Sequence, residues 1–235
     1  MSSWKEDLNV WPRKLPSVQL DIDKLALIII DMQLYDTSRN YGLAHSLKNY
    51  PSMFNYYYDR IDDIVLPNNV RLLHFFRDNN LPVIHVTVGA ELKDGSDQIP
   101  RRKRRDNTMT SDTGVNFTFY KGSKPQQIHP DLKPLEGELV LNKNSSSAFN
   151  STAIDQFLRN MRIEGLFMTG VSTSTCVETT ARDASDRGYE CVLIEDACAS
   201  FDQYSHDATL KIFARMFGEV WSTEEAIQKT NKLMY

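Results

Sequence analysis

Short apolar segments alternating with longer amphipathic ones are the feature that most restricts how this sequence can fold. The clearest is LALIIID at 25–31, a run rich in β-branched residues that ends on an aspartate. Such runs are typical of strands buried on both faces, because a half-exposed strand would alternate apolar with polar residues. Five further segments are predicted to be strands: 82–88, 138–142, 165–171, 189–195 and 219–222.

Helical patterns lie between these strands. They are predicted over 59–80, from about 151 to 161, from about 175 to 188, and near 206–217. Buried strands alternating with helices indicate a parallel sheet with helices on both faces. We therefore expect one Rossmann-like, three-layer α/β/α domain spanning 1–235 with its core at 24–222. Its sheet is expected to be six-stranded and mostly parallel, in the order 3-2-1-4-5-6.

One stretch, about 90–137, lacks either pattern and is rich in Gly, Pro, Asp, Ser and basic residues. Irregular segments this long in compact domains are usually functional or mobile, so we expect a loop that covers the site. The basic run RRKRR at 101–105 is interpreted as part of a solvated loop. A nuclear address, a phosphate-binding patch, or an arginine that binds a substrate carboxylate are the alternatives.

Net charge and composition restrict the classes of partner and the cellular location expected for this chain. The net charge of −4 argues against a nucleic-acid partner, and no apolar stretch reaches the roughly 20 residues of a membrane helix. The first residues, MSSWKEDLNVWPRK, lack the apolar centre of a signal peptide. Three widely spaced cysteines are typical of a reducing compartment, so a cytoplasmic location is expected. There is no G-x-G-x-x-G or P-loop, and no cofactor is expected.

An acid and a thiol should meet at one edge of this sheet. In doubly wound sheets the site lies at the carboxyl ends of the strands, where the strand order reverses. Asp31 ends the first strand and Cys176 follows the fourth across a short turn. With the expected order these strands are neighbours. A thiol in the first turn of a helix also faces unpaired N–H groups, which predicts a pKa below about 8.5.

Each of these residues also has an ordinary structural interpretation. A lone cysteine is often a small buried hydrophobe, and a strand-terminal aspartate such as Asp31 often caps a turn. Lys143, at the end of the third strand, would usually be a solvated surface charge. The aromatic residues Tyr35, Phe119 and Phe149 either line a substrate pocket or fill the core. The run Tyr56–Tyr58 is assigned to a subunit contact or a packed loop.

Five segments, in this order and spacing, resemble the isochorismatase-like cysteine hydrolases. They are IIIDMQ at 28–33, KNSSSAF at 143–149, GVSTSTCV at 170–177, TARDASDRGY at 180–189 and EDACAS at 195–200. Together they cover roughly 24–222. Within the family the likeness is greatest to hydrolases of ureido and carbamoyl compounds, such as the N-carbamoylsarcosine, biuret and ureidoacrylate amidohydrolases.

The resemblance implies a catalytic triad of Asp31, Lys143 and Cys176. It also implies a cis peptide bond between Val171 and Ser172, and an oxyanion hole made of the backbone N–H groups of Ser172 and Cys176. The implied reaction is hydrolysis of a C–N bond in a small amide or ureido substrate through a thioester, with release of ammonia or an amine. A homo-oligomer, dimer or tetramer, is also implied.

Three other functions stay open. Nicotinamidase-like amidases carry a metal site with an Asp-x-His pair after the second strand; this pair is missing here and the five histidines are scattered, so no metal is expected. Isochorismatase-type enzymes cleave a vinyl ether without a thiol, in which case Asp31 would act alone. A non-enzymatic binding protein on the same fold is the third alternative.

Overall fold

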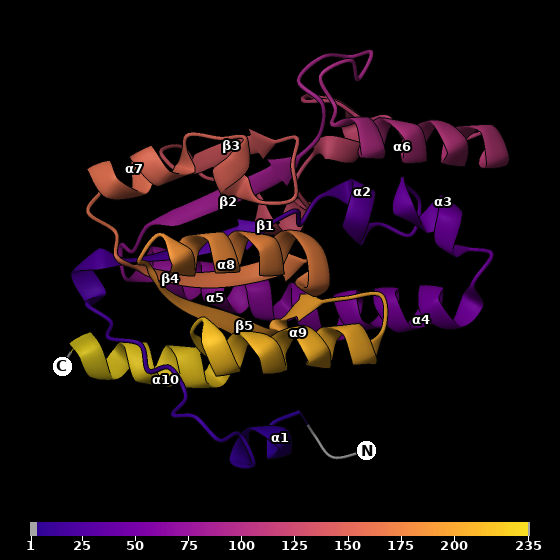
Figure 1. The fold of residues 1–235 in the computed structure, drawn as a ribbon. Helices are drawn as coiled ribbons and strands as arrows, with labels where there is room; N and C mark the ends of the chain where they lie inside the picture. Colours follow the sequence, from indigo (N-terminus) through magenta and orange to yellow (C-terminus); the bar gives the residue numbers. More distant parts are fainter. Residues whose placement is uncertain (1–3, 235) are drawn as a thin grey trace.

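The computed structural model describes residues 4–234 as a single α/β domain around a six-stranded sheet (Figure 1). The sheet order is β3-β2-β1-β4-β5-β6 and every neighbouring pair is parallel, which confirms the predicted fold class and strand order. The strands are β1 (Leu25–Ile30), β2 (Val83–Val88), β3 (Leu139–Lys143), β4 (Gly165–Val171), β5 (Glu190–Ala199) and β6 (Glu219–Trp221).

The helices are α1 (Glu6–Asn9), α2 (Leu34–Thr37), α3 (Leu43–Leu47), α4 (Pro51–Arg60), α5 (Leu66–Asp78), α6 (Pro100–Thr113), α7 (Ile154–Asn160), α8 (Glu178–Asp186), α9 (Gln203–Met216) and α10 (Thr223–Met234). Two π-helical turns join them, η2 (Ile61–Val65) and η6 (Thr173–Val177). Short 3-10 helices are η1 (Ile22–Lys24), η3 (Lys124–Gln126), η4 (Pro130–Leu132) and η5 (Ala148–Asn150).

Two apolar layers hold the helices to the sheet. Strand β1 is buried along its whole length because alternate side chains enter opposite layers. Ala26, Ile28 and Ile30 pack with α7, α8 and α9, whereas the odd-numbered residues of β1 pack with α4, α5 and α10. This explains why a continuous apolar run, rather than an alternating one, marks the central strand.

The two central strands approach unusually closely where they end. Ile30 of β1 pairs with Gly170 of β4, and Gly170 has a φ of 108°. A Cβ atom at this position would lie 2.0 Å from the carbonyl oxygen of Ile30. Only glycine therefore permits both this backbone conformation and this contact. The close approach brings the segment after β1 beside the segment after β4.

The segment 90–137 differs from the prediction of a loop. It contains α6, which begins with Pro100 and ends at Gly114 in a left-handed conformation. The sequence pattern missed this helix because only Asp106 on it is buried, so there is no apolar stripe. The basic run 101–105 is therefore helical and is not part of a solvated loop.

The tyrosine run is also part of a helix. Tyr57 and Tyr58 lie on α4 with no exposed surface and pack into the apolar layer beneath the sheet. The assignment of this run to a subunit contact or packed loop is therefore wrong for these two residues. Between residues 4 and 234, no helix combines the length and the apolar character needed to cross a membrane.

Candidate active site

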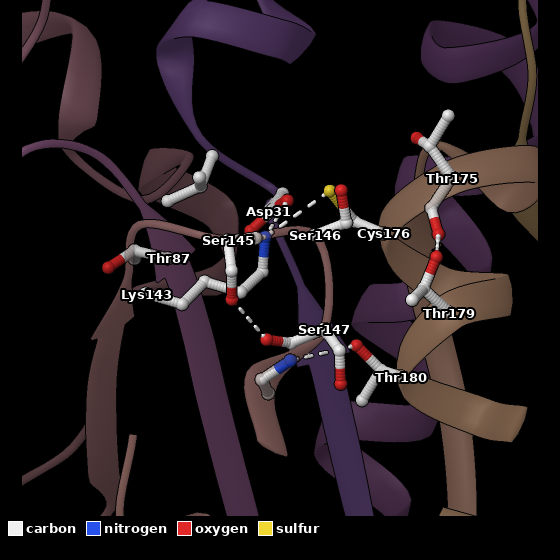
Figure 2. Close-up of polar contacts among 12 residues, drawn as sticks. Asp31, Thr87, Lys143, Ser145, Ser146, Ser147, Thr175, Cys176, Thr179 and Thr180 are labelled. Atoms are coloured by element: carbon white, nitrogen blue, oxygen red, sulfur yellow. Dashed lines mark hydrogen bonds and ion pairs between the residues drawn. The ribbon is translucent and has the colours of Figure 1, made fainter. Parts of the chain in front are cut away.

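Asp31, Lys143 and Cys176 come together at the carboxyl ends of three strands. The Nζ atom of Lys143 lies 2.9 Å from Oδ2 of Asp31 and 3.2 Å from Sγ of Cys176. It also donates to the carbonyl oxygen of Ser145 at 3.1 Å. Figure 2 shows the amino group of Lys143 between the carboxylate and the sulfur. The three side chains that the family resemblance implied as a triad thus form one connected cluster.

Local backbone structure fixes the position of each of these three side chains. Asp31 directly follows β1, where its φ of 53° turns the chain away from the sheet. Its N–H still donates to the carbonyl oxygen of Val86 on β2, at 2.8 Å. Lys143 is the last residue of β3, and Cys176 lies in the π-helical turn η6 that leads into α8. Each chemical group is therefore anchored to a rigid element.

Lys143 is buried with no exposed surface, contrary to the ordinary interpretation of a strand-end lysine. Burial opposes its charge, but the carboxylate of Asp31 and the sulfur of Cys176 outweigh burial and raise the pKa of Lys143. Asp31 is only 2% exposed, and within residues 4–234 its Oδ1 atom has no hydrogen-bond partner. This buried oxygen is the acceptor that remains available for a proton.

The acidity of Cys176 differs from the prediction. Burial, followed by the negative charge of Asp31, raises the pKa of the Cys176 thiol to about 12, although Lys143 acts in the opposite direction. The first turn of a helix does favour thiolate, but desolvation and a neighbouring carboxylate have larger effects here. The raised pKa favours the neutral thiol, so a base is needed to make the sulfur a nucleophile.

The pH dependence of Cys176 alkylation should report this raised pKa. Because the thiolate fraction grows tenfold per pH unit below the pKa, the iodoacetamide rate constant should rise steadily from about pH 6 to about pH 9. It should show no plateau in that range. The measurement is the second-order rate constant at the Cys176 peptide, resolved by mass spectrometry from those of Cys191 and Cys198. A plateau near neutral pH would mean that the thiolate already exists at rest.

A cavity of about 250 Å³ opens above the cluster. Asp31, Ser172 and Cys176 are among the residues that line it. The peptide bond between Val171 and Ser172 is cis. Residues of six separate segments line the cavity: Asp31, Tyr35, Asp36, Leu43, Val88, Ile99, Arg101, Arg102, Arg105, Met109, Asn144, Ser145, Ser146, Val171, Ser172, Thr175, Cys176 and Phe201. Its small size suits a ligand of a few heavy atoms.

The three aromatic candidates have different positions. Tyr35 lines the cavity. Phe119 stacks against Tyr35 with ring centroids 4.0 Å apart and is 2% exposed, so it lies behind Tyr35 and supports it. Phe149 packs in the core layer with α7 and α8, with its ring 6.0 Å from that of Tyr189. The structure therefore brings only Tyr35 of these three residues to the cavity, and the predictions for Phe119 and Phe149 as substrate contacts are not supported.

Asp36 is a cavity residue that the sequence interpretation missed. It lies on the short helix α2, and its Oδ2 atom is buried without a hydrogen-bond partner in the described chain. Burial and the nearby charge of Asp31 raise the pKa of Asp36 to about 7. No motif marks this aspartate, because its position depends on how the chain turns after β1.

The two other cysteines do not line the cavity. Cys191 and Cys198 are both buried on β5. Within residues 4–234, no three His, Cys, Asp or Glu side chains are grouped so that they could hold a metal ion. The absence of a resident metal stays a prediction.

Known proteins are similar to this chain in sequence and in architecture. The family model for the isochorismatase domain matches residues 25–225. An isochorismatase family protein of Bacillus subtilis, YwoC, is 26% identical over 213 residues, covering 91% of this chain and 97% of that protein. The N-carbamoylsarcosine amidase of an Arthrobacter species is 27% identical over 177 residues, covering 73% of this chain and 63% of the amidase.

Solved structures agree on the fold. A cysteine hydrolase from Pseudomonas syringae pv. phaseolicola has a TM-score of 0.74 at 23% identity, covering 95% of this chain and all (100%) of that one. N-carbamoylsarcosine amidase from Thermoplasma acidophilum has a TM-score of 0.62 at 24% identity, covering 86% of this chain and 97% of that one. Since the family model spans most of the sequence, this chain belongs to the isochorismatase family of hydrolases.

Proposed function

We propose that this hydrolase cleaves a C–N bond of a small linear amide or ureido compound through a thioester on Cys176. The observation that carries the proposal is the position of Lys143 Nζ, 2.9 Å from Asp31 and 3.2 Å from Cys176 below the cavity. A buried base, a cation and a thiol in mutual contact are the parts that nucleophilic acyl transfer requires. Relatives named as N-carbamoylsarcosine amidases support chemistry at a C–N bond.

The first half of the reaction forms the thioester. Asp31 accepts the thiol proton as the sulfur attacks the substrate carbonyl, and the charge of Lys143 stabilises the thiolate character that develops. The backbone N–H groups of Ser172 and Cys176 would hold the oxyanion of the tetrahedral intermediate. Asp31 then returns the proton to the leaving nitrogen, the C–N bond breaks, and ammonia or an amine departs.

The second half regenerates the enzyme. Water enters the cavity, Asp31 removes its proton, and the resulting hydroxide attacks the thioester carbonyl. The C–S bond breaks, and the sulfur recovers a proton from Asp31. Because the resting thiol has a raised pKa, the proton transfer to Asp31 has to accompany the attack, which makes the base indispensable. Tyr35, on the cavity wall, would contact the substrate.

Hydroxylamine partitioning tests the thioester directly. The panel comprises biuret, N-carbamoyl amino acids, ureidoacrylate, maleamate and nicotinamide, with ammonia release as the first readout. For any substrate that is turned over, added hydroxylamine should divert product into the hydroxamate of an amide substrate or the N-hydroxyurea of a ureido substrate, because it competes with water for the acyl-enzyme. Ammonia release without any such hydroxylamine adduct would argue against an acyl-enzyme and would overturn the proposed mechanism.

A further inference from the structure

Arginines of α6 form part of the cavity wall. Arg101, Arg102 and Arg105 all line the cavity. They lie on one helix, which Figure 1 shows beside α2 and α3 at the same end of the sheet. The helical spacing explains the selection: Arg105 lies three positions after Arg102 and four after Arg101, so these side chains share a face, whereas Arg104 is exposed and does not line the cavity.

Arg102 is held in place from two sides. Its side chain is only 13% exposed, and its Nε atom lies 3.6 Å from the fully buried carboxylate of Asp106. Its guanidinium carbon lies 5.1 Å from the centre of the Phe119 ring, which in turn stacks on Tyr35. Such an arrangement fixes a planar cation with little remaining freedom.

Arg102 still has unused hydrogen-bonding capacity. Its Nε atom is buried and has no hydrogen-bond partner between residues 4 and 234. Asp106 is instead hydrogen-bonded by Arg105, at 2.9 Å, and by Gln98, at 3.2 Å. Because Nε is buried beside Asp106, a ligand oxygen in the cavity would bind the terminal nitrogens of the guanidinium.

The charge around the cavity is positive. Four cations, Arg101, Arg102, Arg105 and Lys143, face three carboxylates, Asp31, Asp36 and Asp106. Burial and the charge of Asp31 raise the pKa of Asp36 to about 7, so its negative charge is incomplete near neutral pH. The excess positive charge lies on α6, away from the Asp31 side, and favours an anionic group there.

We propose that the substrate carries a carboxylate at the end distant from its scissile carbonyl, and that Arg102 binds this carboxylate, with Arg101 and Arg105 at the rim. The inference rests on the proposed function for the position of the scissile carbonyl near Cys176, but the anion site itself is independent of it. The substrate class is thereby narrowed to amide or ureido acids, and neutral amides are disfavoured. A guanidinium can bind a carboxylate with two parallel hydrogen bonds, which a lysine cannot reproduce.

A pair of alkylating probes separates the anion site from the hydrolysis. N-iodoacetylglycine and N-iodoacetylglycinamide share the same reactive carbon and differ only in a terminal carboxylate. In both, Cys176 sulfur forms an S–C bond, the C–I bond breaks with loss of iodide, and the thiol proton leaves to Asp31 or solvent. The measured quantity is the ratio of the two rate constants at Cys176, divided by the same ratio for glutathione.

The expected normalised ratio is about 10 or more in the unmodified protein, because a charge-assisted contact concentrates the anionic probe in the cavity. Arg102→Gln should reduce it about tenfold, and Arg102→Lys should restore it only in part. Arg104→Gln, on the exposed side of the same helix, is the matched control and should change the ratio less than twofold. Raising the salt concentration on the unmodified protein should also lower the ratio, independently of any folding defect.

A normalised ratio near 1, or one unaffected by Arg102→Gln in a protein with an unchanged melting temperature, would overturn the anion site. Such a result, combined with ammonia release from a neutral amide, would leave the proposed hydrolysis intact. Conversely, a high ratio without turnover of any panel compound would keep the anion site and remove the proposed chemistry.

Discussion

Replacing Cys176 with alanine should reduce kcat/KM by at least about 10⁴-fold, because the proposed reaction has no other nucleophile. The fold should survive. The sulfur borders the cavity, and Lys143 would keep its contacts with Asp31 and the carbonyl oxygen of Ser145. We expect the free energy of unfolding to fall by no more than about 2 kcal/mol. Steady-state ammonia release and urea unfolding measure the two quantities.

Cys191→Ala is the matched control. Cys191 is 1% exposed on β5, in the core layer, and is not a cavity residue. This variant should lose stability, because a buried atom is removed, yet it should retain kcat/KM to within about threefold. If Cys176→Ala still cleaved an ether substrate at the normal rate, the thiol would be dispensable. The isochorismatase-type reaction, with Asp31 acting alone, would then replace the amidohydrolase.

The parallel sheet could be predicted because its evidence is local. A run such as 25–31 is apolar at every position, and this pattern has few structural explanations other than a strand buried on both sides. Asp31 and Cys176 followed from the same reasoning, since strand ends meet where the order reverses. The burial of Lys143 did not follow, because nothing local distinguishes a strand-end lysine facing solvent from one facing a carboxylate.

The polar wall of the cavity was harder to predict for a different reason. Helix α6 buries only Asp106, so its sequence carries no apolar periodicity and resembles a loop. Its position depends on packing between residues distant in sequence, such as Arg102 against the ring of Phe119. Asp36 was missed because its buried environment arises only after the chain has turned at Asp31.

The acidity of Cys176 shows how one local rule can be outweighed. The position near a helix start was predicted correctly, and its effect on a thiol has the expected sign. Burial and the carboxylate of Asp31 depend on the folded structure, however, and together they raise the pKa to about 12. A prediction from position alone therefore had the right location and the opposite direction of the pKa shift.

Lys143→Met should damage both stability and catalysis. The substitution leaves the Asp31 carboxylate, 2% exposed, without the cation that lies 2.9 Å away. Breaking a buried pair on one side costs about 3–5 kcal/mol, because the remaining charge is desolvated and uncompensated. We also expect kcat to fall by at least about 10³-fold, since no charge would then stabilise the developing thiolate. Chemical denaturation and single-turnover kinetics provide the measurements.

Two further variants test whether the loss of stability comes from the buried unpaired charge. Lys24→Met removes a lysine that is 38% exposed and paired with Glu164, and should leave the free energy of unfolding nearly unchanged. The double variant Asp31→Asn with Lys143→Met removes both buried charges and should recover at least about 2 kcal/mol of the lost stability, but none of the activity. If Lys143→Met were as stable as the unmodified protein and kept more than a tenth of its kcat, Lys143 would only fill space. The amino group would then have no electrostatic role, and the carboxylate and thiol would have to react without a cation between them.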